Sequence, residues 1–223
     1  LDEETLIVYS SDHGEQVGEH GLWWKQTFYE DSVKVPAILS WPGHLPEGAR
    51  CDRVISSLDI NATMIEALQC PALPHSRGCS LLPLLREPGA AQWEDVAFSE
   101  FCLDRAGAGG PFPDGGVFQR MIRRGAWKFN YYHGYPCQLF NLEQDPGEQH
   151  DLSGDPGYAE VRRSLQDELL EDWDPDSIAD EMARLRRDNA VLGAWGRHVQ
   201  PADTIRWNLK PEMDYLDKDQ ITQ

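Results

Sequence analysis

The sequence predicts an α/β fold, in which an α/β layer is followed by a small antiparallel sheet and by C-terminal helices. Two apolar, β-branched runs, TLIVYS (5–10) and VPAILS (35–40), are typical of buried strands in a mostly parallel sheet. A helical pattern follows at 57–69, and closely spaced strand patterns occur between residues 117 and 143. Strand, loop, strand and helix in this order indicate the edge of an α/β sandwich.

Residues 1–90 are expected to form the α/β layer. Its helix, SLDINATMIEALQ, places Ile60, Met64 and Leu68 on one face, and Ser57 or Asp59 is the expected N-cap. The loop WPGHLPEG, rich in proline and glycine, ends the second strand.

Residues 91–150 are expected to form a small antiparallel β subdomain, because short strand patterns follow one another at close spacing. The predicted strands are VAFSEF (96–101), VFQRMIRR (117–124), AWKFNYY (126–132) and CQLFNLE (137–143), with a loop of glycine and proline at 105–116.

Residues 151–223 are expected to be a helical segment and a tail. The first helix has an apolar face of Val161, Leu165, Leu169 and Trp173, and the second has one of Ile178, Met182 and Leu185. From residue 194 to 223 no clear period is present. We expect this tail to wrap the body or to meet a partner, and a homo-oligomer formed through it is one expectation.

Composition limits the classes of function. Forty per cent hydrophobic residues and eight tryptophans indicate a globular protein, while a net charge of -18 argues against nucleic acid and anionic membranes as partners. No run of about 18 apolar residues is present, so no transmembrane helix is expected. Five cysteines without a C-x-x-C pair predict neither a disulfide framework nor a zinc ribbon, and favour the cytoplasm over the periplasm or secretion. The N-terminus lacks the features of a signal peptide and reads like the middle of a gene.

Asp12 and His13 follow directly after the first predicted strand, and strand ends are where α/β sheets gather ligands and catalytic groups. A carboxylate oxygen beside an imidazole nitrogen suits a divalent ion of intermediate softness, and Gly14 allows a tight turn. A purely structural Asp-His-Gly turn is the alternative. Lys25, flanked by Trp23 and Trp24, offers a fixed positive charge to an oxyanion, or else is an ordinary surface lysine.

Two further histidines are candidates for substrate contact. His20, between Glu19 and Gly21, would orient the loop or contact substrate. His133, in YYHGYP, would line a substrate pocket from the small subdomain. An ordinary loop histidine is the alternative at both positions.

The stretch SDHGEQVGEHGLWWKQTFYEDSVKVPAILSWPG closely resembles the second half of the sulfatase family, within the alkaline phosphatase superfamily. GCSLLPLL and QLFNLEQDPGEQHDLSGDP resemble later motifs of the same family, in register, and the resemblance covers roughly residues 1–160. The helix that usually reads D-[IL]-x-P-T has Asn61-Ala62-Thr63 here, so the usual proline is absent.

The resemblance implies a partial alkaline-phosphatase-like α/β sandwich and hydrolysis of sulfate esters at a divalent ion. Asp12 and His13 would be two of the metal ligands, and Lys25 would bind the sulfate oxygens and act in catalysis. His13 in place of the more frequent asparagine is similar to choline-sulfatase-like and phosphonate-monoester-hydrolase-like members. The expected metal is calcium, with manganese as the alternative, and the expected substrate is a small sulfate ester or a sulfated glycan.

The family's nucleophile, a formylglycine made from cysteine or serine in C/S-x-P-x-R, has no matching motif in these 223 residues. The sequence is therefore expected to be the C-terminal portion of a sulfatase whose formylglycine lies upstream, and to be inactive alone. Two rivals remain: a phosphonate monoester or phosphodiester hydrolase of the same superfamily, and a non-catalytic fragment with an interaction role.

Overall fold

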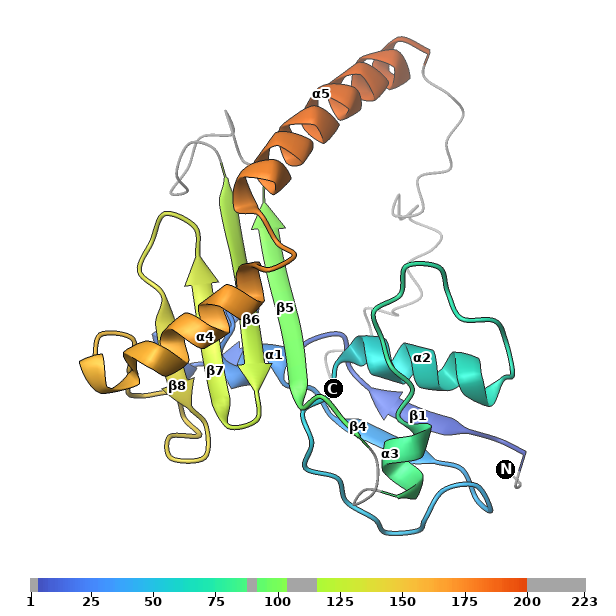
Figure 1. Cartoon of the computed structure of the whole chain (residues 1–223). Coiled ribbons are helices and arrows are strands. Elements are labelled where there is room, and N and C mark those ends of the chain that lie inside the picture. Colours follow the sequence, from blue (N-terminus) through green and yellow to red (C-terminus); the bar gives the residue numbers. More distant parts are fainter. Residues whose placement is uncertain (1–3, 88–91, 104–115, 200–223) are drawn as a thin grey trace, which may run out of the picture. The chain divides into compact units, whose positions relative to one another are not determined.

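The computed structural model of the chain describes residues 4–87, 92–103 and 116–199 (Figure 1). Its strands are β1 (Ile7–Ser10), β2 (Gln16–Val17), β3 (Trp23–Trp24), β4 (Ala37–Ser40), β5 (Val96–Leu103), β6 (Val117–Arg124), β7 (Trp127–Tyr132) and β8 (Gln138–Asn141). Its α-helices are α1 (Glu30–Val33), α2 (Ser57–Ala67), α3 (Leu82–Arg86), α4 (Ala159–Leu170) and α5 (Pro175–Val199). The chain divides into two compact units, residues 1–179 and 180–223, and the site described below lies in the first.

The predicted antiparallel sheet is confirmed, with strand order β5-β6-β7-β8. Because successive side chains of a strand point to opposite faces, the register of β6 and β7 sorts their residues into two sets. Ile122 pairs with Phe129 on one face, and Arg123 pairs with Lys128 on the other. Figure 1 shows α4 across the first of these faces and α1 at the second.

Helix α4 covers the first face with the apolar side chains that the sequence predicted. Leu165 and Leu169 are buried against β6 and β7, and Trp173 packs edge-on against Tyr131 just beyond the helix end. Arg120 of β6 is buried on this face as well, where its guanidinium lies 4.5 Å from the centre of the Phe98 ring. The predicted helical face is therefore confirmed at Leu165 and Leu169, whereas Trp173 is buried but lies beyond the helix.

The strands of the first region pair in a direction that the sequence did not predict. β1 pairs with β4 in antiparallel register, and Val8 lies opposite Leu39 while Tyr9 lies opposite Ile38. Val8 packs on the core, but Tyr9 and Ile38 are 62% and 59% exposed. The expectation of buried strands in a mostly parallel sheet is thus wrong for the described residues. An apolar run indicates a strand with side chains to bury, but it specifies neither the partner strand nor its direction.

Helix α2 forms where the sequence predicted it, although its N-cap differs. Ser56 is the cap: its hydroxyl accepts from Leu58 N, and its own backbone N donates to the carboxylate of Asp59 in a capping box. Ser57 and Asp59, the expected caps, lie at the first and third helical positions. Ile60 packs with Leu81 and Leu84 in the core below β1.

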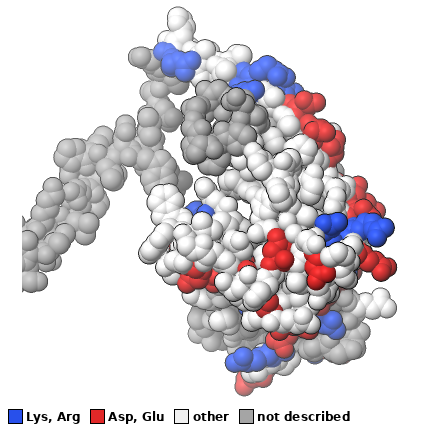
Figure 2. All heavy atoms as spheres, turned by 90° about the vertical axis from the view of Figure 1, so that its left-hand side faces the viewer, with Lys and Arg blue, Asp and Glu red and all other residues white. Residues whose placement is uncertain are grey.

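Helix α5 continues to Val199 and so includes residues 194–199, the first part of the expected tail. Residues 200–223 of the predicted tail and residues 105–115 of the predicted loop lie outside the described residues. In the described part of the chain, no helix has the length and apolarity needed to cross a membrane. Figure 2 shows acidic and basic side chains interspersed over one face, without a single-sign patch there.

Candidate functional site

Three side chains that the sequence singled out meet at the end of β1. Lys25 Nζ lies 2.6 Å from His13 Nε2, and Asp12 Oδ2 lies 3.5 Å from the same nitrogen. Asp12 and His13 follow β1 directly, and Lys25 follows β3. Residues separated by a dozen positions are thus brought into one group, which we call the Asp12–His13–Lys25 cluster.

The hydrogen bonds of His13 define which ring nitrogen faces the cluster. Its Nδ1 lies 2.6 Å from the carbonyl oxygen of Gly14, which can only accept, so Nδ1 holds the proton. Nε2 therefore has the lone pair and accepts from the Lys25 ammonium. An imidazole held by a backbone carbonyl through one nitrogen, with the other nitrogen free to act as a ligand, is the usual arrangement of a metal-binding histidine.

The turn that holds these residues is packed directly against α1. Gly14 N donates to Ser32 O at 2.8 Å, and a Cβ added to Gly14 would lie only 2.0 Å from Asp31 O. No side chain fits at this position, so glycine is required by contact with the helix backbone. The position of His13 therefore depends on the position of α1.

Asp12 is the exposed member of the cluster. Its side chain is 84% accessible, and it accepts a hydrogen bond from His13 N at 3.1 Å. Local backbone hydrogen bonding, together with the proximity of His13 and Lys25, holds the pKa of Asp12 below its usual range. The carboxylate is thus ionised at neutral pH and available as a hard oxygen donor.

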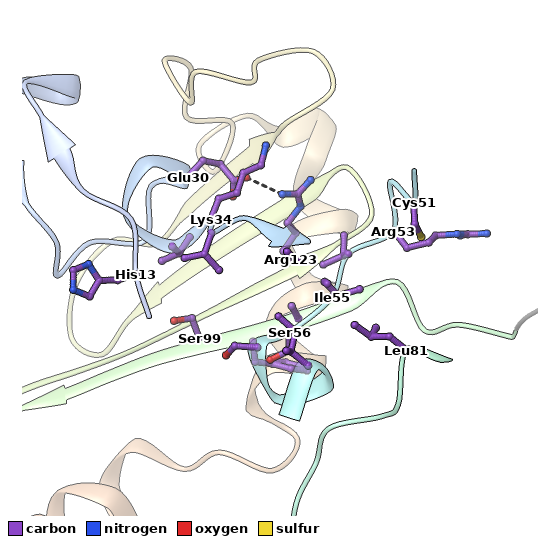
Figure 3. A pocket seen from close by; sticks show the side chains of 18 of the residues that line it. His13, Glu30, Lys34, Cys51, Arg53, Ile55, Ser56, Leu81, Ser99 and Arg123 are labelled. Atoms are coloured by element: carbon purple, nitrogen blue, oxygen red, sulfur yellow. Dashed lines mark hydrogen bonds and ion pairs between the residues drawn. The ribbon is translucent and has the colours of Figure 1, made fainter. Parts of the chain in front are cut away.

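The cluster opens into a cavity of about 1110 Å³ between β4, α1 and the second face of the small sheet (Figure 3). Ile55 and Leu81 form part of an apolar wall, while Ser99 and Arg123 face the cavity from β5 and β6. The cationic side chains that line it are Lys25, Lys34, Arg50, Arg53 and Arg123. The acidic side chains that line it are Asp12, Glu30, Asp52 and Glu100, so the two signs of charge nearly balance in the cavity wall.

The donor set fits part of a divalent metal site. Since such ions hold their ligand atoms about 2.0–2.6 Å away, donors 3.5 Å apart, as in Asp12 and His13, can reach the same ion. In the described residues, no group of three or more His, Cys, Asp or Glu side chains has the geometry to hold a metal ion. Asp12 and His13 would therefore fill two positions of a coordination sphere and leave the others to further ligands.

The two other histidines lie away from the cluster. His20 stacks on Tyr29 at a ring distance of 3.7 Å, and His133 lies 3.5 Å from Asp176 at the far end of β7. Neither lines the cavity that holds Asp12, His13 and Lys25. Their contact with substrate stays a prediction.

The sequence did not identify a group of four charged residues on the second face of the small sheet. Glu30 of α1 accepts from Arg123 at 2.8 Å and from Lys128 at 3.1 Å, and Lys128 also lies 2.8 Å from Glu148. We call these four residues the Glu30 network. Up to 118 positions separate its members, so no local pattern could reveal it. The only available signal was a lysine in the middle of an otherwise apolar and aromatic strand, WKFNYY.

Comparison with protein families gives one matching model, described as N-sulphoglucosamine sulphohydrolase, C-terminal, over residues 18–174. Among curated proteins the chain is similar to the choline-sulfatase of Rhizobium meliloti (strain 1021), with 33% identity over 69% of this chain and 28% of the relative. The chain spans about a third of the length of the curated relatives it matches.

Two solved structures show the same fold over most of this chain. One is the phosphonate monoester hydrolase of Agrobacterium radiobacter, with a TM-score of 0.68 and 30% identity over 76% of this chain and 35% of that one. The other was solved in complex with its substrate, D-glucosamine-2-N,6-O-disulfate, and has a TM-score of 0.64 and 24% identity over 77% of this chain and 35% of that one. Both are similar to this chain only in a part of their own length.

Proposed function

Since this chain belongs to the sulfatase family of the alkaline phosphatase superfamily, and matches its C-terminal portion, we propose that it supplies part of a metal-dependent site that hydrolyses sulfate esters. The observation that supports this most strongly is the convergence of Asp12, His13 and Lys25 at one end of a cavity that further charged side chains of both signs line. Two metal-ligand types and one anion-binding side chain are what hydrolysis of a sulfate ester needs from this part of a site.

Asp12 and His13 would hold a divalent ion through a carboxylate oxygen and through Nε2. When bound, such an ion acts as a Lewis acid that offsets negative charge on the transferring group. Calcium is the ion that the resemblance implies, with manganese as the alternative, and the carboxylate oxygen of Asp12 suits both. Nε2 has one lone pair and can accept from Lys25 or bind an ion, but not both. Lys25 would then be free to turn toward the substrate.

Lys25 would bind the sulfate oxygens and stabilise the charge that develops on the leaving oxygen. Its ammonium presents three donors on a flexible stem, which suits contact with a tetrahedral anion from one side.

The nucleophile would come from outside these residues, as a formylglycine, because the sequence holds no C/S-x-P-x-R motif. We therefore expect the purified 223-residue chain to show no turnover of p-nitrophenyl sulfate. Turnover of this substrate by the chain alone would contradict the proposed division of the site.

Two observations bear on the substrate. One structural neighbour is described in complex with a disulfated glucosamine, which supports a sulfated glycan or another sulfate ester. The likeness to a phosphonate monoester hydrolase at 30% identity supports a second candidate, hydrolysis of phosphonate monoesters or phosphodiesters. Relative rates on aryl sulfate and phenyl phosphonate esters, measured on an enzyme that contains these residues, would separate the two.

The metal role can be tested on the chain itself with manganese and NMR. Mn²⁺ is paramagnetic, so it should broaden the amide signals of residues 11–14 first if it binds Asp12 and His13. Asp12→Asn and His13→Ala should each remove this broadening.

The matched control is His133→Ala. His133 and Asp176 are separated by 3.5 Å, as are His13 and Asp12, and His150 and Asp145 form a third pair of this spacing in the described residues. His133→Ala should leave the broadening at residues 11–14 unchanged. Equal broadening at all three pairs, or none at residues 11–14, would contradict the proposed metal site.

A further inference from the structure

The Glu30 network consists of charged groups that lie largely inside the protein. The Lys128 side chain is fully buried, that of Glu148 is 2% exposed, and that of Glu30 is 15% exposed. Two carboxylates face one ammonium and one guanidinium, so the formal charges balance. Burying these charges costs desolvation energy that such pairing offsets only when the geometry is good.

Glu30 is the only network member on α1, and it is held by three contacts. Its carboxylate accepts from Arg123 on β6 and Lys128 on β7, while its backbone N donates to Glu148 Oε2 at 2.6 Å. The start of the helix is thus fixed to the small sheet through both the side chain and the main chain. Figure 3 shows the Glu30–Arg123 pair at the edge of the cavity, with His13 on the other side of it.

The other end of α1 is fixed to the turn of the cluster. Ser32 O accepts from Gly14 N at 2.8 Å, and Gly14 O in turn accepts from His13 Nδ1 at 2.6 Å. A continuous series of contacts therefore runs from the small sheet through Glu30 and the four-residue helix to the imidazole of His13. A helix this short gains little stability from its own hydrogen bonds, so its placement must come from these contacts.

We propose that Glu30 is a positioning residue, which transmits the fixed geometry of the small sheet through α1 to His13 and Lys25. It touches neither residue directly. Lys25 precedes α1 by five positions, and the intervening Thr27 donates to Gln16 Oε1 at 2.9 Å, so the segment between Lys25 and Glu30 is held at both ends. This inference rests on the proposed function only for the metal- and sulfate-binding role of the cluster. The claim that Glu30 positions His13 and Lys25 does not depend on that role.

The test is hydrogen exchange of the Gly14 amide in the full 223-residue chain. In Glu30→Gln, which keeps the size of the side chain but removes its charge, the bond from Gly14 N to Ser32 O should open more often. Gly14 exchange should accelerate about tenfold or more, the factor that a hydrogen bond to a charged group is worth. The amides of Phe129 and Leu139, in the core of the small sheet, should accelerate less.

A second readout follows the ring of His13. In the parent chain the two ring nitrogens should give ¹⁵N shifts typical of a single tautomer protonated at Nδ1. In Glu30→Gln the shifts should move toward a mixture of tautomers, because the carbonyl of Gly14 is less firmly placed. A role limited to stability would leave the tautomer unchanged in the folded fraction.

Glu168→Gln is the matched control, because Glu168 pairs with Arg124 of β6 on the face of the sheet opposite to α1. It should leave Gly14 exchange and the His13 tautomer as in the parent. Should Glu30→Gln fail to fold, Arg123→Gln removes one partner of Glu30 and leaves the fully buried Lys128 paired.

Gly14 exchange that rises only in proportion to the core amides, with an unchanged tautomer, would overturn the proposal. Because neither readout needs a metal or a substrate, this result can be told apart from a failure of the proposed sulfatase site. Absence of Mn²⁺ broadening at residues 11–14, with both readouts changed in Glu30→Gln, would contradict only the proposed sulfatase site.

Discussion

The small sheet and the strand pair β1–β4 differ in how far the described residues cover them. Both faces of the sheet are packed, and Ile122, Phe129 and Leu139 are completely buried. The strand pair has one covered face, while Tyr9 and Ile38 on the other are mostly exposed. The cluster lies at the end of the less covered region and takes its position, through α1, from the more covered one.

This difference separates the region that stabilises the fold, the small sheet, from the region that holds the candidate site, the end of the strand pair. Buried apolar and paired charged groups fix the sheet to a single arrangement. The exposed strand pair contributes less stability, but its end holds the groups that would bind a metal and an anion. Four predictions, two of them with a comparison variant, test this difference between the two regions.

The largest effect should come from Lys128→Met. It removes the ammonium that Glu30 and Glu148 share and leaves two buried carboxylates with Arg123 alone. Breaking a buried ion pair in this way costs about 3–5 kcal/mol, measured as the free energy of unfolding in urea. Arg124→Met, which removes a partly exposed ion pair with Glu168 on the face that α4 covers, should cost less than about 1 kcal/mol. Equal costs would show that the Glu30 network is no more buried than the Arg124–Glu168 pair.

Gly14→Ala should have the next largest effect. The added Cβ would lie 2.0 Å from Asp31 O, so the turn or α1 has to shift. Overpacking of this kind costs about 1–3 kcal/mol. The substitution should also abolish Mn²⁺ broadening at residues 11–14, because the shift moves His13. A chain with unchanged stability and metal binding would show that the contact is looser than described.

Asp172 should make stability depend on pH in the acid range. A hydrogen bond from Arg120, reinforced by Arg77, lowers the pKa of Asp172 below its usual value near 3.8. The contribution of Asp172 to the free energy of unfolding is therefore fully present above about pH 4. It is lost as the pH falls through the lowered pKa.

Asp172→Asn should cost about 1 kcal/mol at pH 7, a modest figure because the carboxylate is partly exposed. The difference from the parent should shrink below pH 4, as the parent carboxyl takes up its proton. Urea unfolding at pH 7 and pH 3 checks both values. A constant difference across this range would contradict the pairing with Arg120.

Ile38→Ala should have the smallest effect, less than about 0.5 kcal/mol, because the side chain lies on the exposed face of β4. Ile122→Ala, the same change at a fully buried position of β6, should cost about 2–5 kcal/mol. Thermal unfolding of the two variants compares the regions directly. A large cost at Ile38 would show that this face is covered in solution.

Much of the small sheet could be predicted from sequence because its signals are local. Alternation in VFQRMIRR and AWKFNYY is typical of strands, and their close spacing leaves room only for antiparallel turns. The helical spacing of Leu165 and Leu169 likewise predicted the buried face of α4. Pairing of β1 with β4 could not be predicted, because an apolar run is equally compatible with either direction.

The candidate site likewise has one part that the sequence predicted and one part that it did not. Asp12, His13 and Lys25 were singled out within one continuous stretch, and the structure brings them together. Glu30 was part of that stretch, but its partners Arg123 and Lys128 lie more than ninety residues away. Only the fold shows that these residues meet, so the support of the site could not be predicted from the sequence.

The uncovered side of the β1–β4 pair also affects how the chain behaves at high concentration. Each of these strands has one neighbour in the described residues, so each leaves a row of backbone donors and acceptors unpaired beside the apolar side chains of Tyr9 and Ile38. Edges of this kind template the addition of strands from other molecules, and proteins guard them with charged residues. A lysine in place of Ile38 would therefore raise solubility without disturbing the packed sheet.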